Sequence, residues 1–203
     1  MHSAIQHFRS NIERVKAVGG LYEGISHLTT PAIDATDLLR AQIVLVVSAL
    51  DHYIHEVTRL GMLEVFNGVR QPTTAFRRFQ VTIDAAMTGL ADPGSSWFET
   101  EVRAKHGYLA FQRPDKIADA IRLFSLSDLW PAVASKLGMT VTEVKARLEL
   151  IIDRRNKIAH EADLDPTYPE TRWPISIVDT INAVNFIKKI CEAIHSEIVS
   201  PVG

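Results

Sequence analysis

The chain has 203 residues, 46% of them hydrophobic, so it is long enough to bury a core, and we expect one helical domain spanning residues 1–203. Its formal net charge of −2 excludes the overall basic footprint of a protein that coats nucleic acid, although lysines and arginines can still gather in a local basic cleft. Cys191 has no second cysteine with which to form a disulfide. No apolar run approaches the roughly 20 residues of a membrane span, and the N-terminus has no apolar signal core. We therefore expect a soluble, cytoplasmic protein without membrane contact.

Apolar periodicity predicts two long helices in the first third of the chain. The first covers residues 3–18 and ends at Gly19-Gly20, because apolar side chains recur there at spacings of three and four. A polar connector containing Pro31 follows, and the second helix runs from about Thr36 to Phe66, with a bend near Gly61. The apolar stripe of the first helix is Ile5, Phe8, Ile12 and Val15, and that of the second is Ile43, Val47, Leu50, Ile54 and Val57.

A polar stripe borders the apolar stripe of the second helix. Asp51 departs from this division, because helical spacing puts it on the apolar side. An unpaired carboxylate in apolar surroundings is costly, so Asp51 is expected to face a cationic partner on another helix. The polar stripe consists of Ser48, His52, His55 and Arg59.

The middle third is predicted to contain additional short helices. One helix is expected over Thr74–Leu90, where four apolar residues lie at helical spacing: Phe76, Phe79, Ile83 and Met87. The Asp-Pro-Gly-Ser-Ser segment within Ala91–Trp97 is typical of a loop. Beyond it we expect a short helix and an extended piece within Phe98–Phe111, then helices over Asp115–Phe124 and Leu126–Leu137, the last ending at Gly138.

Two capping patterns delimit the C-terminal helices. Thr140, with Glu143 three residues later, is a capping-box pattern, and it begins a helix that runs to about His160. Ser176 and Asp179 mark the start of the final helix in the same way. Because strand alternation is absent, the predicted fold class is an all-α helical bundle. The core stripe of the final helix is expected to be Ile177, Ile181, Val184, Ile187 and Ile194.

Helical phase divides the segment Arg154–Glu161 into an inner and an outer side. At about 100° per residue, Arg155 lies on the apolar stripe of its helix, whereas Arg154 lies on the opposite, solvated face. Asn156 and His160 form the polar edge of the apolar surface. Arg155 and His160 are separated by about 140° and by about 7.5 Å along the axis, so they can border one cleft without stacking on each other.

These residues also have a purely structural interpretation. An inward Arg155 and the misplaced Asp51 are candidates for an ion pair that only stabilises the bundle. A histidine in the last turn of a helix, such as His160, most often compensates the helix dipole at the surface. His52 and His55 lie at i and i+3, where they can line the same cleft as His160 or simply form a polar helix edge.

Arg155 and His160, with Asn156 directly after the arginine, resemble the R-x(4–6)-H motif of HEPN domains. The fuller run Arg154–Asp165 is similar to the RiboL-PSP-type HEPN branch, and so is the run Ser48–Glu56 on the second helix. A weaker resemblance covers Arg113–Gly138, and together these stretches take in most of residues 35–195. Some HEPN toxins have a tyrosine two residues after the histidine. Ala162 stands at that position here, so control through this tyrosine is not implied.

The resemblance implies a compact helical bundle that pairs into a homodimer, with the two motifs facing each other across a cleft. Many HEPN proteins are metal-independent endoribonucleases of toxin, antiviral or RNA-processing systems, and an antitoxin or sensor protein often holds them inactive. His160 suits proton transfer, Arg155 suits the negative charge of the reacting phosphate, and Asn156 can orient His160 or the phosphate. Asp51 is expected to hold Arg155. The remaining supporting candidates are Ser48, His52 and His55.

Two functional hypotheses follow. The first is RNA cleavage without metal or cofactor, which leaves a 2′,3′-cyclic phosphate and a 5′-hydroxyl. The alternative is a non-catalytic HEPN module that binds a partner protein, RNA or a nucleotide, and the net charge of −2 fits this alternative slightly better. A metalloenzyme is disfavoured, because His52-x-x-His55-Glu56 matches neither the H-E-x-x-H nor the H-x-x-E-H pattern of zinc enzymes.

Overall fold

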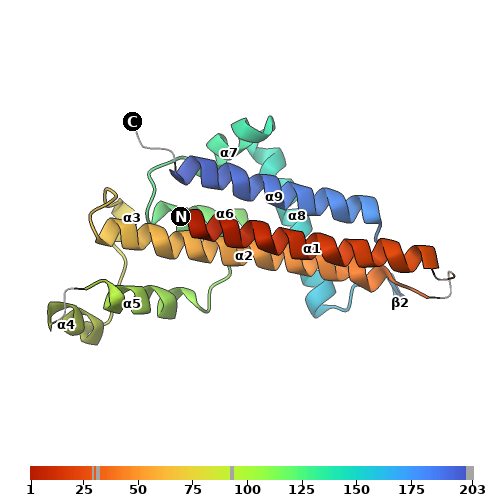
Figure 1. Ribbon diagram of the computed structural model, residues 1–203, viewed down its shortest axis with the longest axis horizontal. Coiled ribbons are helices and arrows are strands. Elements are labelled where there is room, and N and C mark those ends of the chain that lie inside the picture. Colours follow the sequence, from red (N-terminus) through yellow and green to blue (C-terminus); the bar gives the residue numbers. More distant parts are fainter. Residues whose placement is uncertain (29, 31–32, 92–93, 200–203) are drawn as a thin grey trace.

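The chain folds as an all-α bundle with a small hairpin near one end (Figure 1). The computed structural model describes residues 1–28, 30, 33–91 and 94–199. Pro31 of the expected connector and residues 92–93 of the expected loop therefore lie outside the described residues. Within these ranges, no helix is long and apolar enough to cross a membrane. The elements are α1 His2–Leu28, α2 Thr36–Phe66, α3 Thr74–Arg77, α4 Ile83–Ala91, α5 Ser96–His106, α6 Pro114–Arg122, α7 Leu129–Leu137, α8 Val141–His160, β1 Leu164–Asp165, β2 Tyr168–Arg172 and α9 Ile177–Val199.

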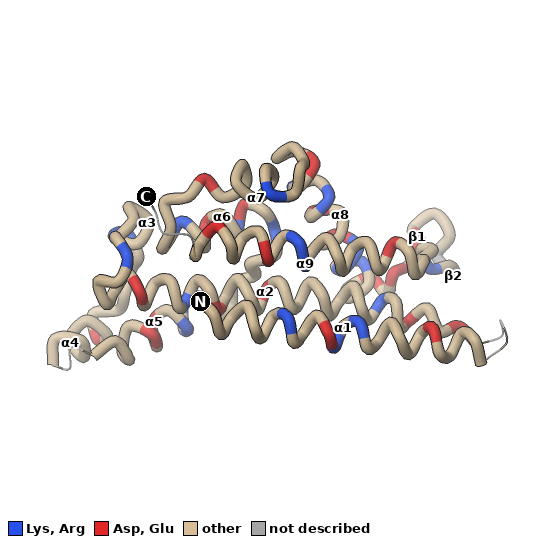
Figure 2. The backbone as a smooth tube through the Cα atoms, turned by 45° about the horizontal axis from the view of Figure 1, so that its top comes forward, with Lys and Arg blue, Asp and Glu red and all other residues tan. Residues whose placement is uncertain are grey.

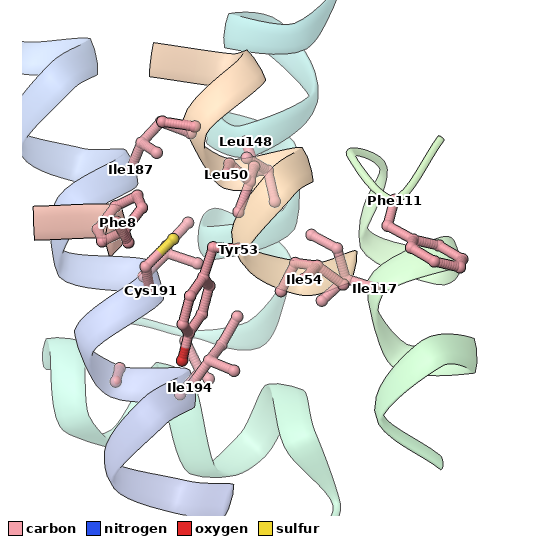
Figure 3. Close-up of a cluster of buried hydrophobic side chains, with 14 of the residues drawn as sticks. Phe8, Leu50, Tyr53, Ile54, Phe111, Ile117, Leu148, Ile187, Cys191 and Ile194 are labelled. Carbon is pink, nitrogen blue, oxygen red and sulfur yellow. The ribbon is translucent and has the colours of Figure 1, made fainter. Parts of the chain in front are cut away.

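The main core is built around α2, which packs against α1, α8 and α9. Large apolar side chains from these helices meet beside Tyr53, as Figure 3 shows. Val184 and Ile187 of α9 are buried as expected. Ile181 is 44% exposed, so the prediction that it belongs to the core stripe is wrong. Ile181 lies about 60° around the helix from Val184, outside the arc that the bundle covers. The predicted stripe of α2 is confirmed, because all five residues are buried: Ile43, Val47, Leu50, Ile54 and Val57.

α1 continues to Leu28, so the prediction that it ends at Gly19-Gly20 is wrong. A Cβ atom at Gly19 would lie 2.6 Å from the side-chain nitrogen of Gln42. Gln42 is itself buried and donates a hydrogen bond to the Val15 carbonyl at 3.0 Å. Gly19 therefore allows α1 to approach α2 closely, and the packing outweighs the low helix propensity of glycine.

The single helix expected over Thr74–Leu90 is also wrong, because the segment forms two helices, α3 and α4. Phe76 and Phe79 pack against a second, smaller hydrophobic cluster, whereas Ile83 and Met87 are 82% and 64% exposed. The four apolar residues at helical spacing thus have different surroundings: Phe76 lies in α3, Phe79 follows that helix, and Ile83 and Met87 lie in α4. The buried residues of this second cluster are Met62, Phe98 and Val102.

The remaining short helices follow the local signals. α5 is followed by a non-helical piece, as expected for Phe98–Phe111, and α6 and α7 lie where two helices are predicted. Gly138 ends α7 in the left-handed conformation, with φ of 66°. The capping box of α8 is present: the Thr140 hydroxyl accepts from the Glu143 N–H at 3.2 Å, and the Glu143 carboxylate accepts from the Thr140 N–H at 2.8 Å.

A two-stranded antiparallel hairpin, formed by β1 and β2, follows α8. The sequence does not predict these strands, because it shows no strand alternation. Ala162 and Asp163, just before β1, have φ of 52° and 60°, which few residues other than glycine adopt. They turn the chain back toward α8 and the start of α2. The strands are too short for an alternating pattern to be visible in the sequence.

Candidate functional site

α8 places the motif residues at the edge of the bundle. Its middle is fixed by buried Leu148 and Ile152, which pack in the main core. Arg155 is half-buried and its Nη1 donates to Asn156 Oδ1 at 3.0 Å. Its Nε is buried and has no acceptor among the described residues. Arg155 therefore faces inward, as its helical phase predicts, with a guanidinium whose hydrogen-bonding capacity is only partly used.

His160 occupies the last turn of α8 with an exposed side chain. Its imidazole makes no hydrogen bond or ion pair with any residue that the structure describes. Asn156 lies one turn earlier, about 40° around the helix from His160, and is half-buried. Asn156 thus stands between the two motif residues: it contacts Arg155 directly and lies on the same side of α8 as His160.

Arg154 is not on a solvated face, and that prediction is wrong. Its side chain is 23% exposed, and its Nη2 lies 2.7 Å from Asp163 Oδ2 and 3.1 Å from the Trp173 carbonyl. Burial lowers the pKa of Arg154, while the nearby Asp163 carboxylate acts in the opposite direction. The hairpin segment folds back over the end of α8 and covers a face that helical phase alone leaves in water. Lys157 is covered in the same way, with its ammonium 5.1 Å from the centre of the Trp173 ring.

Asp163 is the centre of a buried ion-pair cluster. Its Oδ2 accepts from Arg40 Nε at 2.7 Å as well as from Arg154. Arg40 also donates to the Thr36 hydroxyl at 2.6 Å and to the Trp173 carbonyl at 2.9 Å. The cluster fixes the end of α8 and the hairpin segment to the start of α2, and so it positions the region of the motif.

Sequence reasoning missed both Arg40 and Asp163. A signal for Arg40 was available, because it precedes Ile43 and Val47 at helical spacing and so continues the apolar stripe of α2. Asp163 had no comparable signal. It lies in a turn whose conformation depends on the hairpin that follows.

Asp51 has a partner other than the expected Arg155, and the predicted ion pair between them is wrong. Its Oδ1 accepts from the Phe111 N–H at 2.6 Å, and its Oδ2 lies 3.9 Å from His55 Nε2. The extended piece after α5 runs past α2 here, and its backbone N–H needs an acceptor. Asp51 therefore holds this segment in place instead of holding Arg155.

The other supporting candidates lie apart from the motif. His52 and His55 line a pocket of about 220 Å³ between α2 and α5, together with His106, and His160 is not among its lining residues. Burial lowers the pKa of His106 to about 4, and the charge of His55 adds to the shift. Ser48 is exposed on α2. The structure thus brings the two histidines of α2 together with His106, and it does not place them beside His160.

The described residues offer little support for metal or thiol chemistry. No group of three or more His, Cys, Asp or Glu side chains in the described ranges is arranged to hold a metal ion. Cys191 is buried in the core, as predicted, and burial raises the pKa of its thiol well above the usual value. A buried, protonated thiol is a poor nucleophile.

The fold and the motif define the class of protein. The chain is an all-α bundle, and its helix α8 carries an inward arginine followed five residues later by an exposed histidine. These are the features of a HEPN domain. The family model RiboL-PSP-HEPN matches residues 9–200, nearly the whole chain. The chain therefore belongs to the RiboL-PSP-HEPN family, as its residue pattern predicts. No curated protein and no solved structure matches it.

Proposed function

We propose that this protein is a metal-independent endoribonuclease of a defence or toxin-type system. Membership of a HEPN family supports a role of this general kind, because many HEPN proteins cleave RNA. The observation that carries the proposal is the exposed His160 imidazole without a partner in the described chain, on the same helix as the half-buried Arg155. An imidazole and an incompletely bonded guanidinium are the two groups that RNA cleavage without metal requires.

Each residue has a definite task in the proposed reaction. The 2′-hydroxyl loses its proton, its oxygen forms a bond to the adjacent phosphorus, and the bond from phosphorus to the 5′-oxygen breaks as that oxygen takes up a proton. His160 moves the protons, since imidazole is suited to proton transfer near neutral pH. Arg155 stabilises the charge on the non-bridging oxygens, and Asn156 orients the guanidinium through its Oδ1. The products are a 2′,3′-cyclic phosphate and a 5′-hydroxyl.

We further propose that the working site combines two copies of the chain. Arg155 and His160 are about 7.5 Å apart along α8 and about 140° apart around it, so within one copy the two side chains diverge. A second copy facing the first supplies each with the group it lacks. RNA then binds in the cleft of the homodimer. An antitoxin or sensor protein would control the enzyme by covering this cleft.

The proposal is tested by cleavage of an unstructured RNA in EDTA. We expect His160→Ala to reduce the rate about 10²- to 10⁴-fold, the usual contribution of a positioned acid–base group. His27→Ala is the matched control, because His27 is an exposed histidine in the last turn of α1. Unchanged cleavage by His160→Ala removes His160 from the mechanism, and inhibition by EDTA removes metal independence. RNA that is bound but never cut by the wild type is the result expected of a non-catalytic HEPN module.

A further inference from the structure

A basic pocket lies between α7, α8 and α9, and it has a volume of about 690 Å³. Arg147 lies about 80° around the axis of α8 from Arg155 and about 140° from His160, so the pocket opens on a different side of the helix from His160. The blue stretches on these helices in Figure 2 show where basic residues occur. The net charge of −2 leaves room for such a local basic cleft, and here one is present. The polar lining residues are Lys136 of α7, Arg147 of α8, and Asn182, Asn185, Lys188, Lys189 and Glu192 of α9.

Three of the four cations in the lining have no direct ion-pair partner in the described chain, although Lys188 also lies near the carboxylates of Glu13 and Glu192. Lys136 forms an ion pair with Glu197. Glu192, the acidic residue in the lining, is engaged by Arg9 through two hydrogen bonds of 2.8 and 2.7 Å. A concave surface with uncompensated cations attracts anions. The cations without a carboxylate oxygen within 4.0 Å among the described residues are Arg147, Lys188 and Lys189.

The Arg147 guanidinium lies over an aromatic ring. Its central carbon lies 4.4 Å from the centroid of the Phe186 ring, and Phe186 is 3% exposed. Stacking occupies a face of the guanidinium and leaves its N–H edges available, which suits two parallel hydrogen bonds to a phosphate. Asn182 and Asn185 are exposed and add amide donors to the same pocket.

These features favour the phosphates of a nucleic-acid backbone over its bases. Phe186, the aromatic residue in the lining, is buried beneath Arg147, so bases find no open ring on which to stack. Contacts from arginine and lysine to phosphates hold a strand without reading its sequence. Arg147 precedes His160 by 13 residues on α8, a distance of about 20 Å along the axis.

We propose that the pocket between α7, α8 and α9 is a second RNA-binding site, which holds the backbone phosphates of single-stranded RNA irrespective of sequence. The inference rests on the proposed function only in taking RNA as the substrate. It assigns Arg147, Lys188 and Lys189 to binding and gives them no part in bond cleavage.

The test measures binding of a fluorescent oligouridylate to the His160→Ala protein, in which cleavage does not interfere. Adding Lys188→Ala and Lys189→Ala should lower affinity about tenfold. It should also reduce the slope of log K against log salt concentration by about 1.4, because each contact to a single-strand phosphate contributes about 0.7. The matched control is Lys16→Ala with Lys116→Ala, which removes the same charge from α1 and α6 and should leave the slope unchanged.

Equal affinities and equal salt slopes for the two double variants, both still folded by circular dichroism, would overturn the inference. A competition arm adds adenosine monophosphate or inorganic phosphate. We expect displacement of the RNA only at concentrations where potassium chloride of equal ionic strength also displaces it. Displacement at far lower concentrations would overturn an RNA site in favour of a small phosphate ligand. Absence of cleavage by the wild type counts against the proposed function alone, since binding is measured without His160.

Discussion

At the scale of single residues, Arg154 and Arg155 are neighbours in the sequence with different surroundings. Arg154 is bonded to the buried carboxylate of Asp163 and to two backbone carbonyls. Arg155 has only the neutral amide of Asn156 as a partner in the described chain. A guanidinium that is already bound by a carboxylate has little capacity left for a phosphate. Arg154 therefore has a structural role, and Arg155 is the arginine that corresponds to the motif.

The Asp163 cluster leads to a prediction about stability. In Asp163→Asn, Arg40 and Arg154 lose the carboxylate that they share, and two like charges remain partly buried. We expect the free energy of unfolding to fall by about 3 kcal/mol, which is typical when one partner of a buried pair is removed. Urea unfolding followed by circular dichroism measures the loss. Asp153→Asn, which breaks an exposed pair with Arg113, should cost less than about 1 kcal/mol, and equal losses for both variants would contradict the assignment.

The buried His106 leads to a prediction about pH. Burial, with a smaller effect from His55, lowers the pKa of His106 from 6.5 to about 4. Between these two pKa values the unfolded chain binds a proton at His106 that the folded chain does not bind. The free energy of unfolding is therefore unaffected by this residue above pH 6.5 and is lowered by it as the pH falls below 6.5. His106→Phe keeps the ring contacts with Phe79 and Phe111 and removes the titrating group. Urea denaturation at pH values from 7 to 4.5 measures the free energy of unfolding of both proteins. Between these pH values it should fall by about 1–2 kcal/mol less in the variant than in the wild type. Equal falls in both proteins would show that His106 does not contribute to the pH dependence of stability.

At the scale of elements, α2 is the helix on which the others are arranged. It contacts α1, α5, α6, α8 and α9, and its residues take part in both hydrophobic clusters. Gly61 has a packing role within it. A Cβ atom at this position would lie 2.2 Å from Cγ of Phe124, so the missing side chain lets the segment after α6 reach the helix. Gly20 of α1 is different, because a Cβ atom added there would have no neighbouring atom within 4 Å.

This contrast gives a matched pair of substitutions. Gly61→Ala should lower the free energy of unfolding by about 1–3 kcal/mol, because the added methyl group overlaps a fully buried ring. Gly20→Ala should raise it by about 0.5–1 kcal/mol, since alanine is the better helix former and meets nothing there. Thermal and urea unfolding of both variants measure the two effects. Stabilisation by Gly61→Ala would show that Phe124 moves aside and that the contact is not a constraint.

At the scale of the whole molecule, the functional features occupy different sides of one bundle. Arg147 of the basic pocket lies about 80° around α8 from Arg155 and about 140° from His160. α4 lies at the far end of the molecule, away from the hairpin (Figure 1). α4 packs against α5 and exposes Ile83, Met87 and Leu90, so it adds nothing to the main core. The bundle therefore presents Arg155 and His160 at its edge, where the second copy of the proposed homodimer would complete the site.

A composite site predicts that two inactive variants restore each other. Arg155→Gln and His160→Ala should each be inactive alone. In an equal mixture that has exchanged subunits, about half of the dimers are mixed and each has one intact site, so activity should recover to about a quarter of the wild-type value. The assay is RNA cleavage after co-refolding, with the mixture of wild type and His160→Ala as the reference. No recovery, with dimers confirmed by sedimentation, would place the arginine and histidine of each site on the same chain.

Local signals in the sequence determined much of this protein. The capping box of α8, the left-handed Gly138 and the apolar stripe of α2 act within a few residues, and the structure confirms all of them. Short runs also carry the resemblance to the HEPN family, namely Ser48–Glu56 and Arg154–Asp165 with its Arg155 and His160, and the family model confirms it.

The partners of the polar residues were decided only by the tertiary structure. Asp51 bonds a backbone N–H 60 residues away, and Arg40 bonds Asp163 across 123 residues. Helical phase places a side chain on a face of its own helix, but it does not say which distant segment covers that face. For this reason helical phase alone predicts that Arg154 faces solvent, whereas the hairpin segment covers it. The neighbouring Arg155 is not covered in this way, and part of the hydrogen-bonding capacity of its guanidinium stays unused among the described residues.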